Sequence, residues 1–274
     1  MNTLQALVLG FGQALTEFLP VSSSAHLVIL PHLFGWAIQS LVFDTVLHLG
    51  TLCALLFVFG KDFYQVGASL LSDIKNNRLK VSKYSQNSRL GFYLALACIP
   101  AIFAGLLLEP YIESQFRRIE YVIVFLTFGT ILLFIADFYN TKNKESGTSI
   151  SAKKALIVGI FQIFALFPGV SRSGSTISAG MLAGLSRLET AKFSFMLSVP
   201  MVFAAASYEL LKNYASAVTY PPMLFLSGFV ASFVGGIIVI KFLLGFLTNH
   251  SLKVFILYRI LLIFGLIFLV SILN

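Results

Sequence analysis

Six long apolar runs decide what this chain can fold into. Each holds about 20 residues, the length that crosses the hydrocarbon core of a bilayer as a helix. Lipid cannot hydrogen-bond free backbone groups, so such segments must be helical. With 58% hydrophobic residues and a mean hydropathy of +0.90, the sequence predicts an all-α polytopic membrane protein with six transmembrane helices. The predicted spans are Leu41–Gly60, Leu90–Leu108, Tyr121–Phe138, Ala191–Leu211, Met223–Leu247 and Val254–Leu273.

Two further apolar segments, residues 3–35 and 155–185, are interrupted by polar turns. Pro20 breaks the first segment, and a small polar stretch follows it. The break in the second is Pro168–Thr176, which holds one arginine, four hydroxyls and two glycines. The pieces are too short to span a bilayer. We therefore predict two re-entrant helical hairpins, whose irregular backbone is tolerated only where protein or a water-filled cavity surrounds it.

The two interrupted segments repeat each other. A shift of 149 residues aligns them without a gap, and three predicted spans follow each one. An odd number of spans reverses the direction of the second copy. We therefore predict an inverted-topology repeat of residues 1–140 and 155–274, with a site where the two breaks meet. The identical pairs are Gly10/Gly159, Gln13/Gln162, Phe18/Phe167, Val21/Val170, Ser22/Ser171 and Ser24/Ser173.

Most of the positive charge lies between predicted spans. The formal net charge is +8, and residues 61–89 and 141–154 are strongly basic. Two spans separate these segments, so both lie on one side, which the positive-inside rule places in the cytoplasm. We interpret the charge as membrane orientation, with no nucleic acid among the partners. Lys241 and Arg259 lie inside spans but within reach of the cytoplasmic face, so we place both outside the site and expect Arg259→Lys to be mild.

The polar turns hold side chains suited to phosphate. Hydroxyls and a guanidinium recognise an anion with several oxygens, and Ser171 or Ser173 could cap a new helix whose free N–H groups point at that anion. The alternative is an ordinary polar loop with Arg172 reaching lipid headgroups, but the repeated pattern favours the anion site. Asp44 and His48 share a face of the first span and are a weaker candidate for a second layer around it. The predicted phosphate-binding residues are Gln13, Ser22, Ser24, Ser171, Ser173, Gly174 and Thr176.

Four side chains in the hairpins could carry out catalysis. Glu17 is a carboxylate at membrane depth, which is expensive to bury and marks function. Gln13 lies one helical turn before it, and their oxygens suit Mg²⁺ or Ca²⁺. His26 follows Ser23 by three residues, can act as base or nucleophile, and is predicted to form one unit with it. Arg172 can clamp a phosphoryl group. These parts predict metal-assisted phosphoryl transfer, with water, Ser23 and His26 all open as the nucleophile.

The motifs resemble those of undecaprenyl pyrophosphate phosphatases of the bacitracin-resistance type. The resemblance rests on Gln13-x-x-x-Glu17 and on the two segments 20–26 and 168–176, and it extends over nearly the whole chain. It implies a bacterial inner-membrane hydrolase that converts undecaprenyl diphosphate, a C55 isoprenyl lipid, to the monophosphate. This recycles the carrier for cell-wall synthesis and gives bacitracin resistance. The expected partners are this lipid and membrane lipids, with a homodimer as one option for the assembly.

The resemblance also implies roles for single residues. The family's Glu/Gln-x-x-x-Glu pair falls on Gln13 and Glu17, its serine–histidine element on Ser23 and His26, and its phosphate arginine on Arg172. The family's site is expected to face the periplasm. Because the first position of the pair is Gln in this chain, Glu17 is the only motif carboxylate, which makes a tightly held metal less certain.

Two other functions fit parts of the pattern. Secondary transporters are also built from inverted repeats with interrupted helices, so a lipid-phosphate flippase would need the same pocket without the chemistry. A phosphatidic-acid-type phosphatase also pairs Ser-x-x-His with an arginine, but it resembles enzymes with a second histidine further on. Here no histidine follows Arg172 until His250, in a predicted cytoplasmic turn. A purely structural role leaves Glu17, His26 and Arg172 unexplained.

Overall fold

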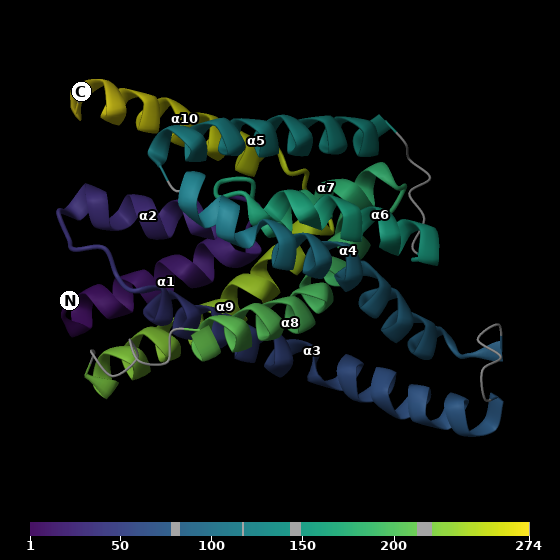
Figure 1. Ribbon diagram of the computed structural model, residues 1–274. Coiled ribbons are helices and arrows are strands. Elements are labelled where there is room, and N and C mark those ends of the chain that lie inside the picture. The colour runs from purple at the N-terminus through teal and green to yellow at the C-terminus, as the bar shows by residue number, and fades with distance from the viewer. Residues whose placement is uncertain (78–82, 117, 143–148, 213–220, 274) are drawn as a thin grey trace.

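The fold consists of helices that run roughly parallel to one long direction of the molecule (Figure 1). The computed structural model describes residues 1–77, 83–116, 118–142, 149–212 and 221–273, and no strand occurs among them. The elements are α1 (Thr3–Phe18), α2 (Ser23–Phe34), α3 (Leu41–Asn77), α4 (Gln86–Gln115), α5 (Ile119–Lys142), α6 (Ala152–Gln162), the 3₁₀ turn η2 (Ile163–Leu166), α7 (Arg172–Leu182), α8 (Arg187–Lys212), α9 (Pro222–Leu247) and α10 (Lys253–Leu273).

Six of the described helices, α3, α4, α5, α8, α9 and α10, are long and apolar enough to cross a membrane. They coincide with the six predicted spans, which confirms the all-α polytopic fold class. The shorter pairs α1–α2 and α6–α7 occupy the predicted hairpins, each with an irregular turn between its helices. The predicted repeat of residues 1–140 and 155–274 stays a prediction.

Two predicted loops are wrong in extent. The segment 61–89 is largely helical, because α3 continues to Asn77 and α4 already begins at Gln86. The predicted loop 109–120 is helical as far as Gln115. Charged residues end an apolar span, but they do not end a helix, since Lys, Glu and Gln are good helix formers. Part of the predicted loop 141–154, residues 143–148, lies outside the described residues.

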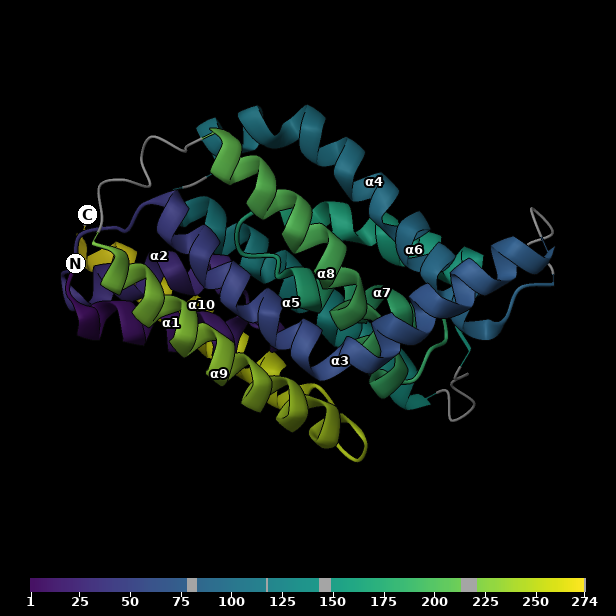
Figure 2. The same ribbon diagram turned by 90° about the horizontal axis from the view of Figure 1, so that it is seen from below.

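The first helix of each hairpin packs against the second long helix of the other half. α1 lies along α9, and α6 lies along α4. Glycines at equivalent positions permit both contacts: a Cβ on Gly10 would collide with the carbonyl of Gly228, and one on Gly159 with the backbone of Ala97. Small residues of this kind let helix backbones approach closely in membranes. Seen from below, α9 also runs beside α3 (Figure 2). The two halves are therefore interlocked through their hairpins.

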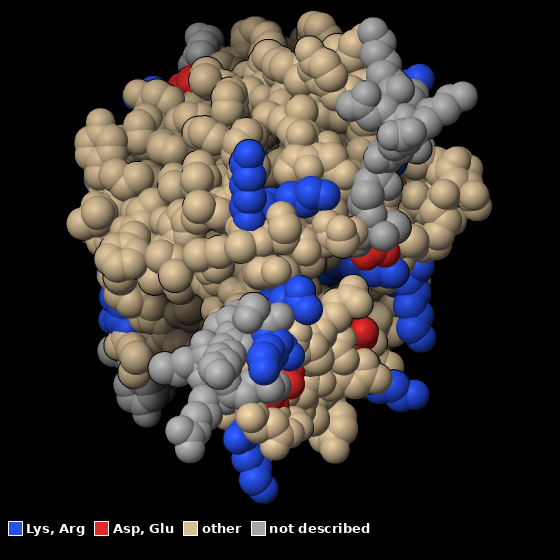
Figure 3. Space-filling model, turned by 90° about the vertical axis from the view of Figure 1, so that its right-hand side faces the viewer, with Lys and Arg blue, Asp and Glu red and all other residues tan. Residues whose placement is uncertain are grey.

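Basic residues gather at one end of the bundle. Both chain termini lie at the opposite end (Figure 1). The basic end holds the C-terminus of α3 and the N-termini of α4 and α6, and Lys and Arg outnumber Asp and Glu on its surface (Figure 3). The basic segments on either side of α4 and α5 thus share one side, as the spacing of the spans predicts.

Candidate active site

The turns inside the two hairpins have the same local geometry. Ser22 and Ser171 are the only described non-glycine residues with positive φ, and both have φ 76°. Each caps the helix that follows: Ala25 N donates to Ser22 Oγ at 3.4 Å, and Gly174 N donates to Ser171 Oγ at 3.1 Å. Positive φ is rare for non-glycine residues and tends to occur at functional sites. The predicted Ser171 cap is confirmed, and Ser22 is its counterpart.

The two turns contact each other directly. Ser173 Oγ donates to Leu19 O at 3.1 Å, and Gly169 N donates to Ser24 Oγ at 3.4 Å. The N-terminal ends of α2 and α7 therefore come to one place in the interior. Helix N-termini carry unpaired N–H groups and partial positive charge, which favours a bound anion. The predicted meeting of the hairpins is confirmed.

The Glu17 carboxylate is the centre of this place. Its Oε1 accepts from Arg172 Nη2 at 2.8 Å. Its Oε2 accepts from Ser23 Oγ at 2.7 Å and from Gln13 Nε2 at 3.1 Å, and lies 3.6 Å from His48 Nε2. A buried carboxylate needs such partners, because burying its charge without them would cost a large amount of free energy. Gln13, Glu17, Ser23 and Arg172 are thus brought together, and His48 joins them.

Arg172 does not point to lipid headgroups. Its second terminal nitrogen, Nη1, donates to Ser194 O at 3.2 Å and to Ser198 Oγ. Only 16% of the side chain is exposed. The alternative reading of Arg172 is therefore wrong: α8 and Glu17 hold the guanidinium from two sides.

His26 and Ser23 have different hydrogen-bond partners and do not bond each other. Its Nδ1 bonds Ser22 O at 2.7 Å, and its Nε2 bonds the hydroxyl of Tyr258 at 2.6 Å. Both ring nitrogens are therefore occupied, while Ser23 donates to Glu17. The structure does not bring Ser23 and His26 together as the predicted unit, although both lie at the start of α2.

The remaining predicted phosphate ligands mostly stabilise the turns. Thr176 is fully buried, and its hydroxyl bonds Arg172 O at 2.8 Å and Ser194 Oγ at 2.6 Å. The hydroxyls of Ser22 and Ser24 lie 3.2 Å apart, as do those of Ser171 and Ser173. Among the hydroxyls of the two turns, Ser24 is exposed and Ser23 is partly exposed. These two are the hydroxyls that an incoming anion could reach.

The position of Arg259 differs most from the one that the sequence predicts. It is fully buried, and it donates to carbonyls of both turns, to Pro20 O at 3.0 Å and to Gly169 O and Val170 O at 3.3 and 3.2 Å. It also bonds Thr130 Oγ1 at 2.8 Å and Leu126 O at 2.9 Å. The guanidinium therefore joins the two breaks from the side of α5 and α10. The prediction that Arg259 reaches the membrane surface is wrong. Lys241, by contrast, is exposed.

The predicted site does not include four residues that the structure places in its surroundings: Ser194, Ser198, Tyr258 and Thr130. Ser194 and Ser198 are one helical turn apart, but that spacing is ordinary in a packed membrane helix. Thr130 and Tyr258 lie within apolar predicted spans, and a threonine or tyrosine there is ordinary in a membrane helix. Nothing local in the sequence distinguishes them, because each contacts a residue far along the chain.

The site offers some of the oxygen ligands that a divalent cation needs. Gln13 Oε1 is buried and has no hydrogen-bond partner, although the amide nitrogen of the same side chain bonds Glu17. An amide oxygen beside a carboxylate is a suitable ligand pair for Mg²⁺ or Ca²⁺. No cluster of three or more His, Cys, Asp or Glu occurs in the described parts of the chain. These donors fit a cation whose remaining ligands are substrate oxygens and water.

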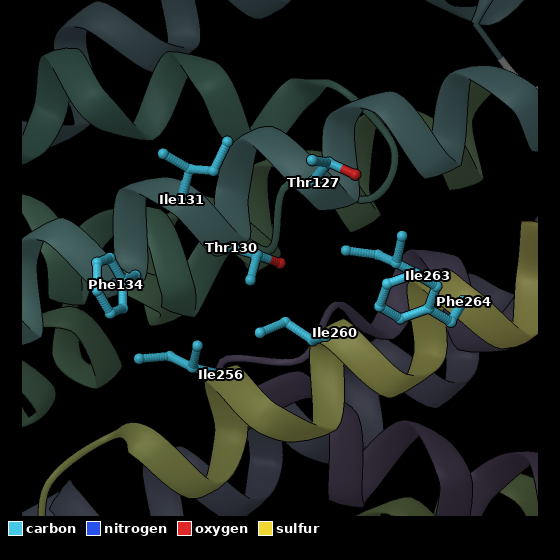
Figure 4. A pocket seen from close by; sticks show the side chains of 8 residues that line it. All are labelled: Thr127, Thr130, Ile131, Phe134, Ile256, Ile260, Ile263 and Phe264. Atoms are coloured by element: carbon cyan, nitrogen blue, oxygen red, sulfur yellow. The ribbon is translucent and has the colours of Figure 1, made fainter.

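A hollow of about 290 Å³ elsewhere in the molecule lacks such chemistry (Figure 4). It lies between α5 and α10, and apart from two threonines its walls are apolar. One of its lining residues, Thr130, accepts a hydrogen bond from Arg259. It is lined by Thr127, Thr130, Ile131 and Phe134 of α5 and by Ile256, Ile260, Ile263 and Phe264 of α10.

Comparison with known proteins matches residues 6–267 to the family described as bacitracin resistance protein BacA. The chain belongs to the BacA family. It is 41% identical over 262 residues to the undecaprenyl-diphosphatase of Caldicellulosiruptor bescii, covering 94% of both chains. It is 39% identical over 277 residues to that of Chloroherpeton thalassium, covering 96% of this chain and 94% of the relative. It is 37% identical over 262 residues to the undecaprenyl-diphosphatase of Idiomarina loihiensis, covering 96% of this chain and 97% of the relative. The resemblance found in the motifs of this BacA-family chain is thereby confirmed.

Proposed function

We propose that this BacA-family protein hydrolyses undecaprenyl diphosphate to undecaprenyl phosphate and inorganic phosphate where the two turns meet. One observation carries the proposal: the Glu17 carboxylate accepts a hydrogen bond from the Ser23 hydroxyl on one oxygen and pairs with Arg172 on the other. A nucleophile, its base and a phosphate-binding guanidinium thus lie side by side. The relatives, which are named undecaprenyl-diphosphatases, indicate the substrate.

The diphosphate head group reaches the site at Ser23 and Ser24, which are partly exposed and exposed. Ser23 and Arg172 are the first residues of α2 and α7, so the terminal phosphate meets the N-terminal ends of two helices at once. Their N–H groups and the guanidinium fork stabilise the charge that spreads over the phosphoryl oxygens during transfer. The isoprenyl chain stays among lipids while the head group reaches the polar turns.

Ser23 performs the first step. Its Oγ bonds to the terminal phosphorus while the bridging P–O bond breaks, and its proton passes to Glu17 Oε2. Undecaprenyl phosphate leaves with the electron pair of the broken bond. Arg172, still paired with Glu17, holds the transferring phosphoryl group. The hydrogen bond of 2.7 Å already aligns Ser23 Oγ with the base that receives its proton.

Water completes the reaction. It attacks the phosphoserine, the P–Oγ bond breaks, and Glu17 returns the proton to Ser23 Oγ. Inorganic phosphate leaves with the oxygen and protons of that water. The turn carrying Ser23 must stay fixed through both steps, since the same atoms are used twice.

Gln13 and Glu17 would hold a divalent cation beside the substrate, Gln13 through its unpartnered Oε1 and Glu17 through a carboxylate oxygen. When bound, Mg²⁺ or Ca²⁺ would supply positive charge that neutralises the diphosphate oxygens and stabilises the departing undecaprenyl phosphate. The bacterial inner membrane is the proposed location, with the basic end of the bundle in the cytoplasm. A homodimer stays an untested option.

Phosphate release by the purified protein tests the proposal. Wild-type protein in detergent micelles with Mg²⁺ is expected to release inorganic phosphate from undecaprenyl diphosphate and to leave the monophosphate, identified by mass spectrometry. Phosphate carried transiently on Ser23 should be trapped by acid quenching during turnover. A flippase would move lipid between leaflets of a vesicle without release. No release by folded wild-type protein would contradict the proposed function.

A further inference from the structure

The turn that presents Ser23 is held in a conformation that its own sequence does not favour. Ser22, the residue before Ser23, has φ 76° and ψ 92°, which is strained for a residue with a Cβ. Such a conformation persists only where surrounding contacts fix it. The direction of the Ser23 hydroxyl depends on this residue, because Ser23 follows it directly at the start of α2.

His26 supplies the contact on Ser22. The carbonyl of Ser22 accepts the backbone N–H of His26 at 3.3 Å and the ring Nδ1 at 2.7 Å. A carbonyl only accepts, so the proton of the imidazole lies on Nδ1. The ring therefore acts as a second clamp on the strained residue. It is 7% exposed, which leaves it little freedom to move.

Tyr258 fixes the other side of the ring. Its hydroxyl lies 2.6 Å from His26 Nε2, and the two rings stack at 5.7 Å with 12° between their planes. With Nδ1 protonated, the neutral ring presents an acceptor at Nε2, and the phenol donates to it. Tyr258 comes from α10, whose next residue, Arg259, holds Pro20 O in the same turn. The helix thus braces one turn at two successive positions.

We infer that Tyr258 is a positioning residue for the phosphatase reaction, acting through the His26 ring and the Ser22 carbonyl to aim the Ser23 hydroxyl at Glu17. The contacts form one chain: Tyr258 hydroxyl, His26 Nε2, His26 Nδ1, Ser22 carbonyl, and then Ser23 to Glu17 at 2.7 Å. The Ser22 carbonyl sets the tautomer of the ring, and the Tyr258 hydroxyl holds the ring in place against that carbonyl. The inference rests on the proposed function.

The second turn lacks this arrangement. Ser175 stands at the position equivalent to His26, and its hydroxyl donates to Phe161 O at 2.5 Å, not to Ser171. The Ser171 carbonyl accepts the backbone N–H of Ser175 at 2.9 Å. The ring clamp is therefore confined to the turn that carries the nucleophile.

Tyr258→Phe tests the inference, because it keeps the stacked ring and removes only the hydroxyl. Turnover of undecaprenyl diphosphate should fall about 10-fold in kcat with little change in KM, since the head group still binds but the nucleophile is less well aimed. The second readout is independent of activity. The chain has four histidines, so ¹⁵N-histidine NMR resolves the tautomer of each, with His26→Ala identifying the His26 signals. The Nδ1–H tautomer should dominate in both proteins, because the Ser22 carbonyl only accepts, but the Nδ1 proton should exchange with solvent faster in Tyr258→Phe, where the ring is no longer held at Nε2.

Tyr139→Phe is the matched control, since Tyr139 is an exposed tyrosine on the neighbouring helix α5. It should leave kcat, the exchange rate of the His26 Nδ1 proton and the melting temperature at wild-type values. Wild-type kcat in Tyr258→Phe with an unchanged exchange rate would overturn the inference. A loss of kcat that follows a lower melting temperature, with the exchange rate unchanged, would also overturn it and reduce Tyr258 to packing. Failure of the wild type to release phosphate would instead overturn the proposed function, while the exchange rate would still report on Tyr258.

Discussion

The guanidinium of Arg172 donates to the carboxylate of Glu17 at 2.8 Å across 155 positions of sequence. Each residue belongs to a different hairpin, so the ion pair exists only where the two turns meet. Ser23 shares the same carboxylate. A phosphoryl group placed at this pair would be in reach of a nucleophile, a base and a charge clamp, which explains why neither hairpin could carry out the reaction alone.

Arg172→Lys should lose most activity while keeping the charge. Lys presents a point charge and cannot bond Glu17, Ser194 and Ser198 with one planar group. We expect a fall in kcat on the order of 10²-fold, as when one preorganised donor is removed. Steady-state phosphate release measures it. Arg118→Lys, an exposed arginine paired with Glu120, is the control and should keep wild-type turnover. Normal kcat in Arg172→Lys would contradict the clamp.

Arg259→Lys should be harmful, contrary to the expectation from sequence. The guanidinium satisfies five acceptors, and an ammonium has three donors on a different geometry. Buried carbonyls of both turns would lose partners, at a cost of about 1–3 kcal/mol for each unsatisfied group. Thermal unfolding in detergent should show a clearly lower midpoint, together with reduced turnover. Lys241→Arg, at an exposed position, should change neither. An unshifted midpoint in Arg259→Lys would show that the bridge is dispensable.

Removal of divalent cations should stop turnover. Glu17 and Gln13 Oε1 provide few protein ligands, so the cation is expected to exchange readily and to be stripped by a chelator. Gln13→Glu adds a second carboxylate and should lower the Mg²⁺ concentration that gives half-maximal activity. Gln13→Leu should raise it. Full turnover after exhaustive chelation would exclude a cation from the mechanism.

The helix ends at the basic end of the bundle should be inaccessible from outside the cell. Asn76, near the end of α3, and Lys154, near the start of α6, lie at the basic end of the bundle. Single cysteines at these positions, in a chain with Cys53→Ala and Cys98→Ala, should resist a membrane-impermeant maleimide in intact cells and react after permeabilisation. Labelling of either in intact cells would reverse the proposed orientation.

The sequence predicts the parts of this site that depend on local spacing. Hydropathy identifies the six spans, the prolines and hydroxyls mark the two breaks, and the spacing of Gln13 and Glu17 places them on one face, where their side chains bond at 3.1 Å. The cap at Ser171 follows from the same kind of reasoning. Each of these features depends on residues that lie close together in the sequence.

Contacts between distant elements could not be predicted in this way. The spacing of Ser23 and His26 suggests a pair, but the positive φ of Ser22 and the approach of α10 direct His26 to Tyr258 instead. Arg259 lies near the start of a predicted span, yet the packing of α10 against α5 and the two turns puts it in the core. Periodicity shows which residues share a face of a helix, but it does not show what that face meets.

The most direct test of the site is a double-mutant comparison of Ser23 with its two candidate partners. Phosphate release from undecaprenyl diphosphate is measured for Ser23→Ala, Glu17→Gln, His26→Ala, and the pairs of Ser23→Ala with each of the others, all checked for a folded, monodisperse state. Because the proposed mechanism uses Ser23 and Glu17 together, as nucleophile and base, their double variant should be about as poor as the worse single one, a strongly non-additive result. His26→Ala alone should retain more activity than Glu17→Gln. Defects of Ser23→Ala and Glu17→Gln that multiply in the double variant would contradict the account.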